Sequence, residues 1–222
     1  MLTLQISDLN IQETNAHLIR KTDNAALYAA LSGAAHVTDI SAEVQCLMAP
    51  GYRLIQVNHR LHPNDDEFEI ALINDLESSV AYYNKVLIST ITDLSSRRAV
   101  QNLAWRSPSA QHAAVLRNVV QQVLFDYLLE RYDVILSDNP KTGNGLFFWQ
   151  RQISNAIAYG LRVYYLQGTS TQFQLIPTQK ALNSLVDRLW SGAHTHQDHF
   201  TLISKAALPA EALGAFNLAA TV

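Results

Sequence analysis

Side chains able to do chemistry are concentrated in the segment 106–112, which reads Arg-Ser-Pro-Ser-Ala-Gln-His. A hydroxyl residue followed by proline is typical of a helix start, with Ser107 as the cap and Pro108 in the first helical position. The first amides of a helix have no partner inside it and carry a partial positive charge, so they can bind a phosphate. The alternative is that this segment only starts a helix and holds no ligand.

A second cluster follows the apolar strand pattern at 132–136 (YDVIL). Asp138 stands at the end of that strand, where α/β folds place functional groups, and its carboxylate could orient or deprotonate an amine. It could equally open a turn, because Asp-Asn-Pro is a natural turn sequence. The loop that follows contains Thr142, and the next helix carries Trp149, which is either a core residue or a substrate contact. This loop lacks the Gly-Lys-Ser/Thr of a P-loop, so ATP binding is not expected.

Histidine and cysteine residues give weaker signals. The stretch AHTHQDHF holds four groups able to bind zinc or nickel, namely His194, His196, Asp198 and His199. The spacing of these groups does not define a four-ligand metal site, so we expect a solvated polar loop and no metal. A single cysteine, Cys46, excludes an intrachain disulfide and a cysteine-based zinc site.

Composition excludes several classes of protein. Among 222 residues, 48 % are hydrophobic and only 16 % charged, below the roughly 25 % of an average domain. The net charge is −3 and no long basic run is present, so broad nucleic-acid binding is not expected. Because no apolar run approaches the roughly 18 residues of a membrane span, we expect no membrane insertion and a cytoplasmic protein.

Periodicity predicts one α/β domain over residues 1–222, with a core over about 1–176 and a C-terminal extension over 177–222. We expect a mixed, mostly antiparallel central sheet flanked by helices. The expected strands are 2–6, 53–58, 68–73, 80–91, 99–105, 132–136, 163–166, 173–176 and 200–204. The expected helices are 22–31 (capped by Thr22 or Asp23), 42–48 (capped by Ser41), a largely buried one from Ser107 to about 131, 146–157, and one capped by Thr178.

This order of elements, with the segments 106–112 and 132–149, resembles the acyl-CoA-dependent N-acyltransferase (GNAT) family, in particular its phage and mobile-element members. The resemblance covers about residues 1–176 as topology and 99–167 as motif. It implies that a small-molecule or protein amine attacks the thioester of acetyl-CoA or another acyl-CoA. It assigns cofactor binding to Arg106, Ser107, Ser109, Ala110, Gln111 and His112, catalysis to Asp138 and Tyr165, and substrate contact to Thr142 and Trp149.

Two departures from the family pattern support an alternative. The segment 106–112 has no glycine, whereas the family uses glycines there to let the backbone approach phosphate closely. Trp149 lies near the place of the family's proton-donating tyrosine, so Tyr164 or Tyr165 would have to substitute. The second hypothesis is therefore an inactive binding module of acyltransferase shape, with apolar surface for a protein partner or a second copy. A metal-dependent enzyme using the His-rich loop is the third.

Overall fold

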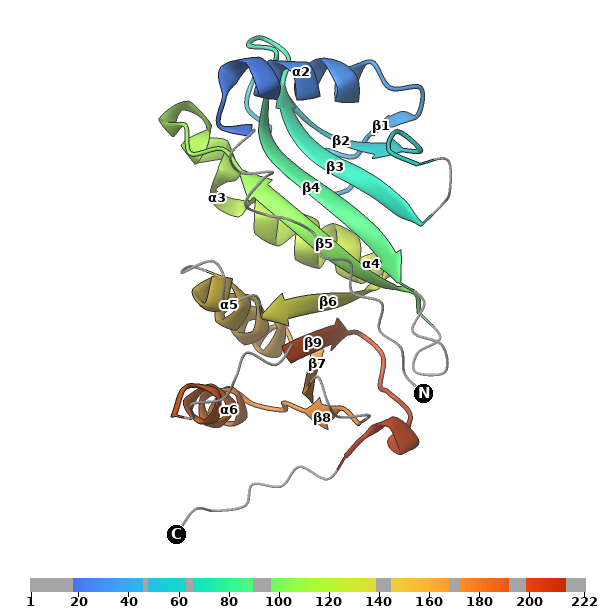
Figure 1. Cartoon of the computed structure of the whole chain (residues 1–222), viewed down its shortest axis with the longest axis vertical. Helices are drawn as coiled ribbons and strands as arrows, with labels where there is room; N and C mark the ends of the chain where they lie inside the picture. The colour runs from blue at the N-terminus through green and yellow to red at the C-terminus, as the bar shows by residue number, and fades with distance from the viewer. Residues whose placement is uncertain are drawn as a thin grey trace. The chain divides into compact units, whose positions relative to one another are not determined.

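The computed structural model describes residues 18–45, 48–62, 66–89, 97–138, 145–167, 172–191 and 199–214. The chain divides into two compact units. Gln5–Ser89 and Val100–Arg131 form the meander unit, whereas Met1–Leu4, Thr90–Ala99 and Tyr132–Val222 form the C-terminal unit. Each unit contains helices and strands (Figure 1), which confirms the predicted α/β class. The prediction of a single domain stays a prediction.

In the described residues of the meander unit, five strands form the sheet. In sheet order they are β1 (Val37–Asp39), β2 (Tyr52–Asn58), β3 (Glu67–Asn74), β4 (Ser79–Ser89) and β5 (Ala99–Arg106). The pairs β1–β2, β2–β3 and β3–β4 are antiparallel. The predicted strands at 53–58, 68–73 and 99–105 are thus confirmed, and the strand at 80–91 is confirmed as far as residue 89, where the described segment ends. The short polar β1 was not anticipated.

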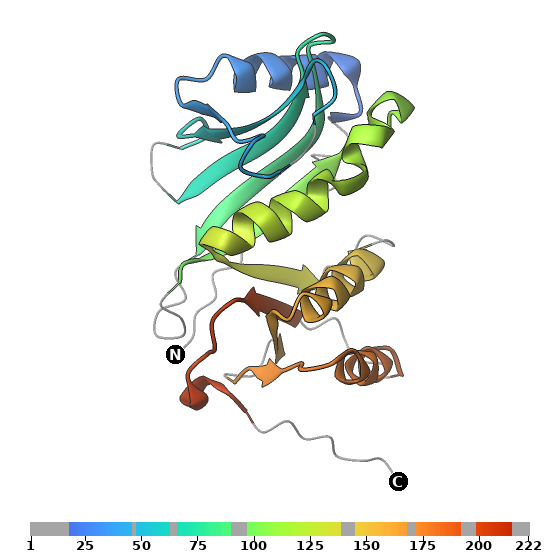
Figure 2. The ribbon, with the colours of Figure 1, turned by 180° about the vertical axis from the view of Figure 1, so that it is seen from behind.

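Helices cover both faces of this sheet. Helix α2 (Lys21–Ser32) packs over a core cluster that includes Ile55, Ala71 and Trp105. On the other face lies α3 (Ala113–Gln122), continued by the π-helical segment Val123–Leu128 and by α4 (Leu129–Arg131), and Figure 2 shows this long helix lying across the strands. There the Tyr127 hydroxyl donates to Gln56 Oε1 of β2 at 2.7 Å. Because both faces are covered, the strand β3 is buried along most of its length rather than on alternate residues.

Helix α2 is fastened to β4 by one buried side chain. Asn24 donates through Nδ2 to the carbonyl oxygens of Leu18 at 3.3 Å and Val80 at 3.0 Å, and its Oδ1 accepts from the Val80 amide at 2.8 Å. The next residue, Ala81, is an extra residue in the β3–β4 register. The Ala81 carbonyl accepts the amide of Ser107 at 2.8 Å. This bulge therefore fixes where the chain leaves β5.

The predicted helix at 42–48 is wrong, because residues 41–45 form a turn. Ser41 does not cap a helix: its hydroxyl accepts the amide of Leu54 in β2 at 2.9 Å, and its own amide donates to the Asp39 carboxylate at 2.9 Å. Gln45 has a positive φ of 51°, which no helix accepts. Cys46 lies outside the described residues.

Two predicted helix starts are also displaced. Helix α2 begins at Lys21 and no side chain caps it, so neither Thr22 nor Asp23 has the predicted role. Residues 107–109 are not helical: a short 3₁₀ turn spans Ala110–His112 and α3 follows from Ala113. The cause is the hydrogen bond between Ser107 and Ala81, which holds Ser107 to β4 beyond the end of β5.

Where the structure describes the C-terminal unit, four strands pair in the sheet order β6 (Asp133–Asp138), β9 (His199–Ser204), β7 (Arg162–Gln167) and β8 (Gln174–Leu175). Strand β9 is antiparallel to both β6 and β7. The unit also holds α5 (Gly145–Ala158), α6 (Gln179–Ser191) and a 3₁₀ turn at Ala210–Ala212. The predicted cap of α6 is confirmed, because the Ala181 amide donates to Thr178 Oγ1 at 3.2 Å. The predicted strand 2–6 lies outside the described residues.

Among the glycines that the structure describes, two have a positive φ. Gly51, with φ +85°, lies in the turn before β2, and a Cβ there would come within 2.6 Å of Leu76 Cγ. Gly160, with φ +72°, follows α5 and a Cβ there would meet open space. Within the part of the chain that the structure covers, no helix is long and apolar enough to cross a membrane.

Candidate functional site

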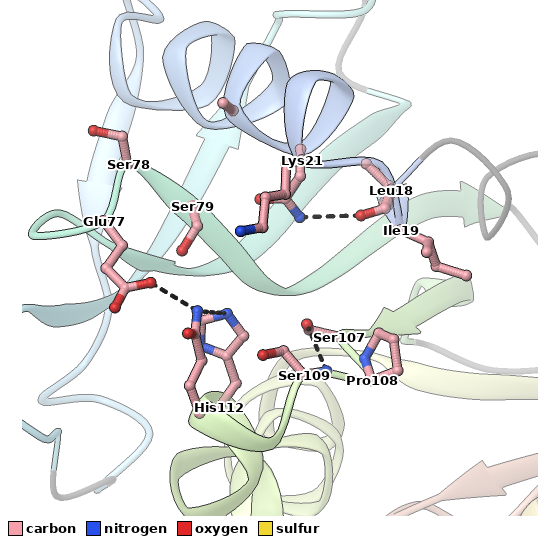
Figure 3. A pocket seen from close by; sticks show the side chains of 13 residues that line it. Leu18, Ile19, Lys21, Glu77, Ser78, Ser79, Ser107, Pro108, Ser109 and His112 are labelled. Atoms are coloured by element: carbon pink, nitrogen blue, oxygen red, sulfur yellow. Dashed lines mark hydrogen bonds between the residues drawn. The ribbon is translucent and has the colours of Figure 1, made fainter.

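A pocket of about 530 Å³ opens in the meander unit, within the range of about 300–1,000 Å³ typical of small-molecule sites. Three pieces of chain form its walls (Figure 3): the start of α2 with the residues before it, residues 77–79 of the β3–β4 hairpin, and residues of the segment 107–112. The segment that sequence analysis singled out therefore lies at a concave surface.

Local hydrogen bonds position the hairpin wall. Asp75 opens the turn and accepts Nε of Arg53 at 2.7 Å and the hydroxyl of Tyr28 at 2.9 Å. The hydrogen bond from Arg53 holds the pKa of Asp75 below its ordinary value. Ser78 then takes a positive φ of 50°, which reverses the chain into β4 and leaves Glu77 at the pocket.

Four side chains form one hydrogen-bonded series at the pocket. Gln111 Nε2 donates to Glu77 Oε2 at 2.7 Å and contacts His112 Nε2 at 3.2 Å, and His112 Nδ1 contacts the Tyr52 hydroxyl at 2.8 Å (Figure 3 shows the part between Glu77 and His112). An amide nitrogen only donates, so His112 Nε2 must be the acceptor. The imidazole proton is therefore on Nδ1 and is directed to the Tyr52 oxygen.

His112 is held in the neutral form. Its ring is 3 % exposed, and burial lowers its pKa, with the Glu77 carboxylate opposing part of that shift. Protonation at Nε2 would also place a donor against the Gln111 amide, which is itself a donor. The result is a neutral imidazole with a lone pair beside a pocket, which is the arrangement of a general base.

The backbone amides of residues 107–109 are not available as a phosphate cradle. Ser107 donates its amide to the Ala81 carbonyl, Pro108 has none, and Ser109 donates its amide to Ser107 Oγ at 3.2 Å. The hydroxyl protons of Ser107 and Ser109 are still able to donate. Both serines line the pocket.

The structure separates the six predicted cofactor residues into two groups. Four of them line the pocket, namely Ser107, Ser109, Gln111 and His112. Arg106 does not: it donates through Nη2 to the Leu116 carbonyl at 3.2 Å. Ala110 begins the 3₁₀ turn and is not part of the lining.

The other predicted site residues belong to the C-terminal unit. Tyr165 is buried in β7, opposite Thr201 of β9. Trp149 is buried in α5, and its indole nitrogen has no hydrogen-bond partner in the described structure. Asp138 is the last residue of β6, but its side chain, like all of Thr142, lies outside what the structure describes. The roles assigned to these four residues stay predictions.

The structure describes only some of the remaining candidate residues, namely Tyr164 and part of the His-rich segment. Tyr164 has a structural role, because its hydroxyl accepts the Leu208 amide at 3.1 Å. The residues His194, His196 and Asp198 lie outside the described ranges. Among the residues that are described, no group of three histidine, cysteine or acidic side chains could hold a metal ion.

Comparisons of the chain with protein-family models, curated proteins and solved structures found no match. The pocket itself is therefore the basis for assigning a function. Sequence analysis missed three of the residues that matter there: Lys21, Tyr52 and Glu77. Each comes from a different element, and no local pattern signals that they meet; Tyr52 and His112, for instance, are 60 positions apart.

Proposed function

We propose that the chain is an acyl-CoA-dependent N-acyltransferase whose amine substrate enters the meander-unit pocket. One observation carries the proposal: the Gln111 amide nitrogen lies between the Glu77 carboxylate and the unprotonated Nε2 of His112. A substrate ammonium that displaced this amide would donate to the same two acceptors. The antiparallel run of strands β2 to β4, followed by β5 and the long helix from Ala113, agrees with part of the expected acyltransferase order and adds support.

The two acceptors suit the two requirements of an amine nucleophile. At neutral pH an alkylamine is protonated, so a carboxylate is needed to attract it and a base is needed to remove its proton. Glu77 serves the first purpose and His112 the second. The Tyr52 oxygen accepts from Nδ1–H and would stabilise the imidazolium that forms. Asp138, the amine-handling residue expected from the sequence, is not required in this scheme.

Acyl-CoA is the second substrate, and the reaction balances without other reactants. His112 takes one proton from the ammonium, and the free amine attacks the thioester carbonyl carbon. The carbon–nitrogen bond forms, the nitrogen gives up its second proton, and the carbon–sulfur bond breaks. Coenzyme A leaves as a thiolate that takes up this second proton, and the His112 imidazolium releases the first proton to solvent. Because the amides of 107–109 are engaged, we assign phosphate contacts to the hydroxyl groups of Ser107 and Ser109.

The engaged amides also favour a second candidate. A chain that keeps the pocket but has no free amide at 107–109 would bind a small polar ligand without transferring an acyl group. This is the binding-module hypothesis in a specific form, with the ligand located in the pocket rather than on an apolar surface.

The test uses the full chain, acetyl-CoA and a set of primary amines, with free coenzyme A detected by a thiol-reactive dye. Cys46 is the single cysteine, so the protein adds little background. We expect amine-dependent release of coenzyme A, and we expect His112→Gln to lower kcat roughly 10²- to 10⁴-fold. His36→Gln, which changes an exposed histidine of the same unit outside the pocket, is the control and should leave kcat unchanged.

Two results would remove the enzymatic proposal. One is the absence of amine-dependent release together with no heat on titration of millimolar acetyl-CoA into the protein. The other is a His112→Gln variant as active as the wild type. Binding of an amine without acetyl-CoA turnover would select the binding module.

A further inference from the structure

The pocket contains two opposite charges on different walls. Lys21 comes from the first turn of α2 and Glu77 from the hairpin (Figure 3). In the described part of the chain, Lys21 makes no ion pair and Glu77 bonds the neutral amide of Gln111. Both charges are therefore available to a ligand, because neither is neutralised by the other.

Further features favour an anion near Lys21. The start of α2 lines the pocket, and a helix N-terminus carries a partial positive charge. Ser79 lines the pocket from β4, and its hydroxyl oxygen is shielded from solvent with no hydrogen-bond partner among the described residues. Buried polar atoms are normally satisfied, so this hydroxyl would gain an acceptor if a bound carboxylate displaced the atoms that cover it.

We propose that the amine substrate is a zwitterion: a free α-amino acid or a closely related amino-carboxylate. Its ammonium lies between Glu77 and His112, in the position of the Gln111 amide nitrogen, and its carboxylate lies against Lys21. The inference rests on the proposed function for the role of the ammonium. Lys21 and Glu77 are both exposed, so each attracts an opposite charge to the pocket without being a buried charge. A simple amine would make no use of Lys21, and a purely anionic ligand would be repelled by Glu77.

The volume of the pocket is consistent with this class. About 530 Å³ exceeds what the charged ends of an amino acid fill, so room is left for a side chain. That side chain would contact the apolar part of the lining, which includes Leu18, Ile19 and Pro108.

Binding without acyl-CoA tests the inference directly. Each common L-amino acid, together with β-alanine and γ-aminobutyrate, is titrated into the full chain by calorimetry at millimolar concentration. Any amino acid that binds is compared with its decarboxylated amine and its N-acetyl derivative. We expect each analogue to bind about tenfold more weakly or worse, because each lacks one charged contact. The inference is overturned if no amino-carboxylate binds, or if the decarboxylated amine binds as tightly.

A matched pair of variants tests the position of the carboxylate. Lys21→Met should weaken amino-acid binding about tenfold and leave binding of the decarboxylated amine unchanged. Arg20→Met is the control, because Arg20 is adjacent and exposed, lies 3.9 Å from Asp23, and does not line the pocket. Thermal unfolding of both variants verifies that each is folded. Equal amino-acid affinity in Lys21→Met and wild type would overturn the assignment.

The failure of this inference and the failure of the proposed function give different results. Amino-acid binding that depends on Lys21, with no release of coenzyme A, would support the zwitterion pocket and refute acyl transfer. Coenzyme A release that is equally fast with an amino acid and its decarboxylated amine would support acyl transfer and refute the zwitterion preference.

Discussion

Replacement of Asn24 by alanine should destabilise the meander unit and loosen one wall of the pocket. The side chain is 9 % exposed and bridges α2 to both polar backbone groups of Val80. Alanine removes these hydrogen bonds, each worth about 1 kcal/mol net, and leaves buried backbone groups unpaired at about 1–3 kcal/mol. We expect a loss of about 2–4 kcal/mol in the free energy of unfolding.

The variant Asn24→Asp separates the loss of the hydrogen-bond donor from the loss of side-chain volume, because it keeps the size of the side chain. A carboxylate can still accept the Val80 amide, but it places negative charge against the carbonyl oxygens of Leu18 and Val80, which now have no donor. At neutral pH this variant should be at least as unstable as Asn24→Ala. Its stability should recover as the pH falls, since the protonated carboxyl regains a donor.

Urea unfolding followed by circular dichroism measures the free energy, and hydrogen exchange at the Val80 amide reports the contact itself. Thr22→Ala is the control, because Thr22 is exposed on the same helix. If Asn24→Ala lies within about 0.5 kcal/mol of the wild type and the Val80 amide keeps its protection, Asn24 does not fasten α2 in the way argued above.

Three further predictions concern stability. Gly51→Ala and Gly160→Ala should each lose about 1 kcal/mol in the free energy of unfolding by urea, because both glycines have a positive φ. The Cβ at position 51 would also displace the exposed Leu76 side chain, so the loss there should be slightly larger. No loss at either position would contradict the prediction. Tyr83→Phe should cost about 1.5–3 kcal/mol by the same assay, since it removes a 2.6 Å hydrogen bond to the buried Glu69 carboxylate, and an unchanged midpoint would count against it. The lowered pKa of His112 predicts a stabilising contribution that is fully present above pH 6.5 and lost as the pH falls through the lowered value. The free energy of unfolding should therefore decrease less between neutral and acidic pH in the His112→Gln variant than in the wild type. Identical pH profiles for the two proteins would refute this.

The strands of the meander unit could be predicted because their signals are local. Residues 68–73, 80–91 and 99–105 are apolar or β-prone runs, and the first two are separated by the turn 75–78. The cap at Thr178 was also predictable, because its partner is three residues away. Where a residue's hydrogen-bond or packing partner is close in sequence, the local residue pattern is sufficient to predict the structure.

The wrong predictions concern residues whose local structure is determined by a hydrogen-bond partner far away in the sequence. Ser41 has the features of a helix cap, but the amide of Leu54 in β2 takes its hydroxyl. Ser107 precedes a proline like a helix cap, but the bulge at Ala81 holds it to the sheet. The candidate site follows the same rule: sequence analysis located the segment 107–112, whereas the residues that complete the pocket come from distant parts of the chain and could not be paired with it.

The position of β9 has a consequence for biosynthesis. A ribosome makes β6 and β7 long before it makes residues 199–204, yet the late strand lies between the two early ones. Until it arrives, the edges of β6 and β7 that pair with β9 present unpaired amide and carbonyl groups, which are prone to join other chains. Thr201 and Ile203 of β9 are fully buried once it is inserted. The sheet of the C-terminal unit therefore cannot be completed until residues 199–204 are free to pair with both neighbours.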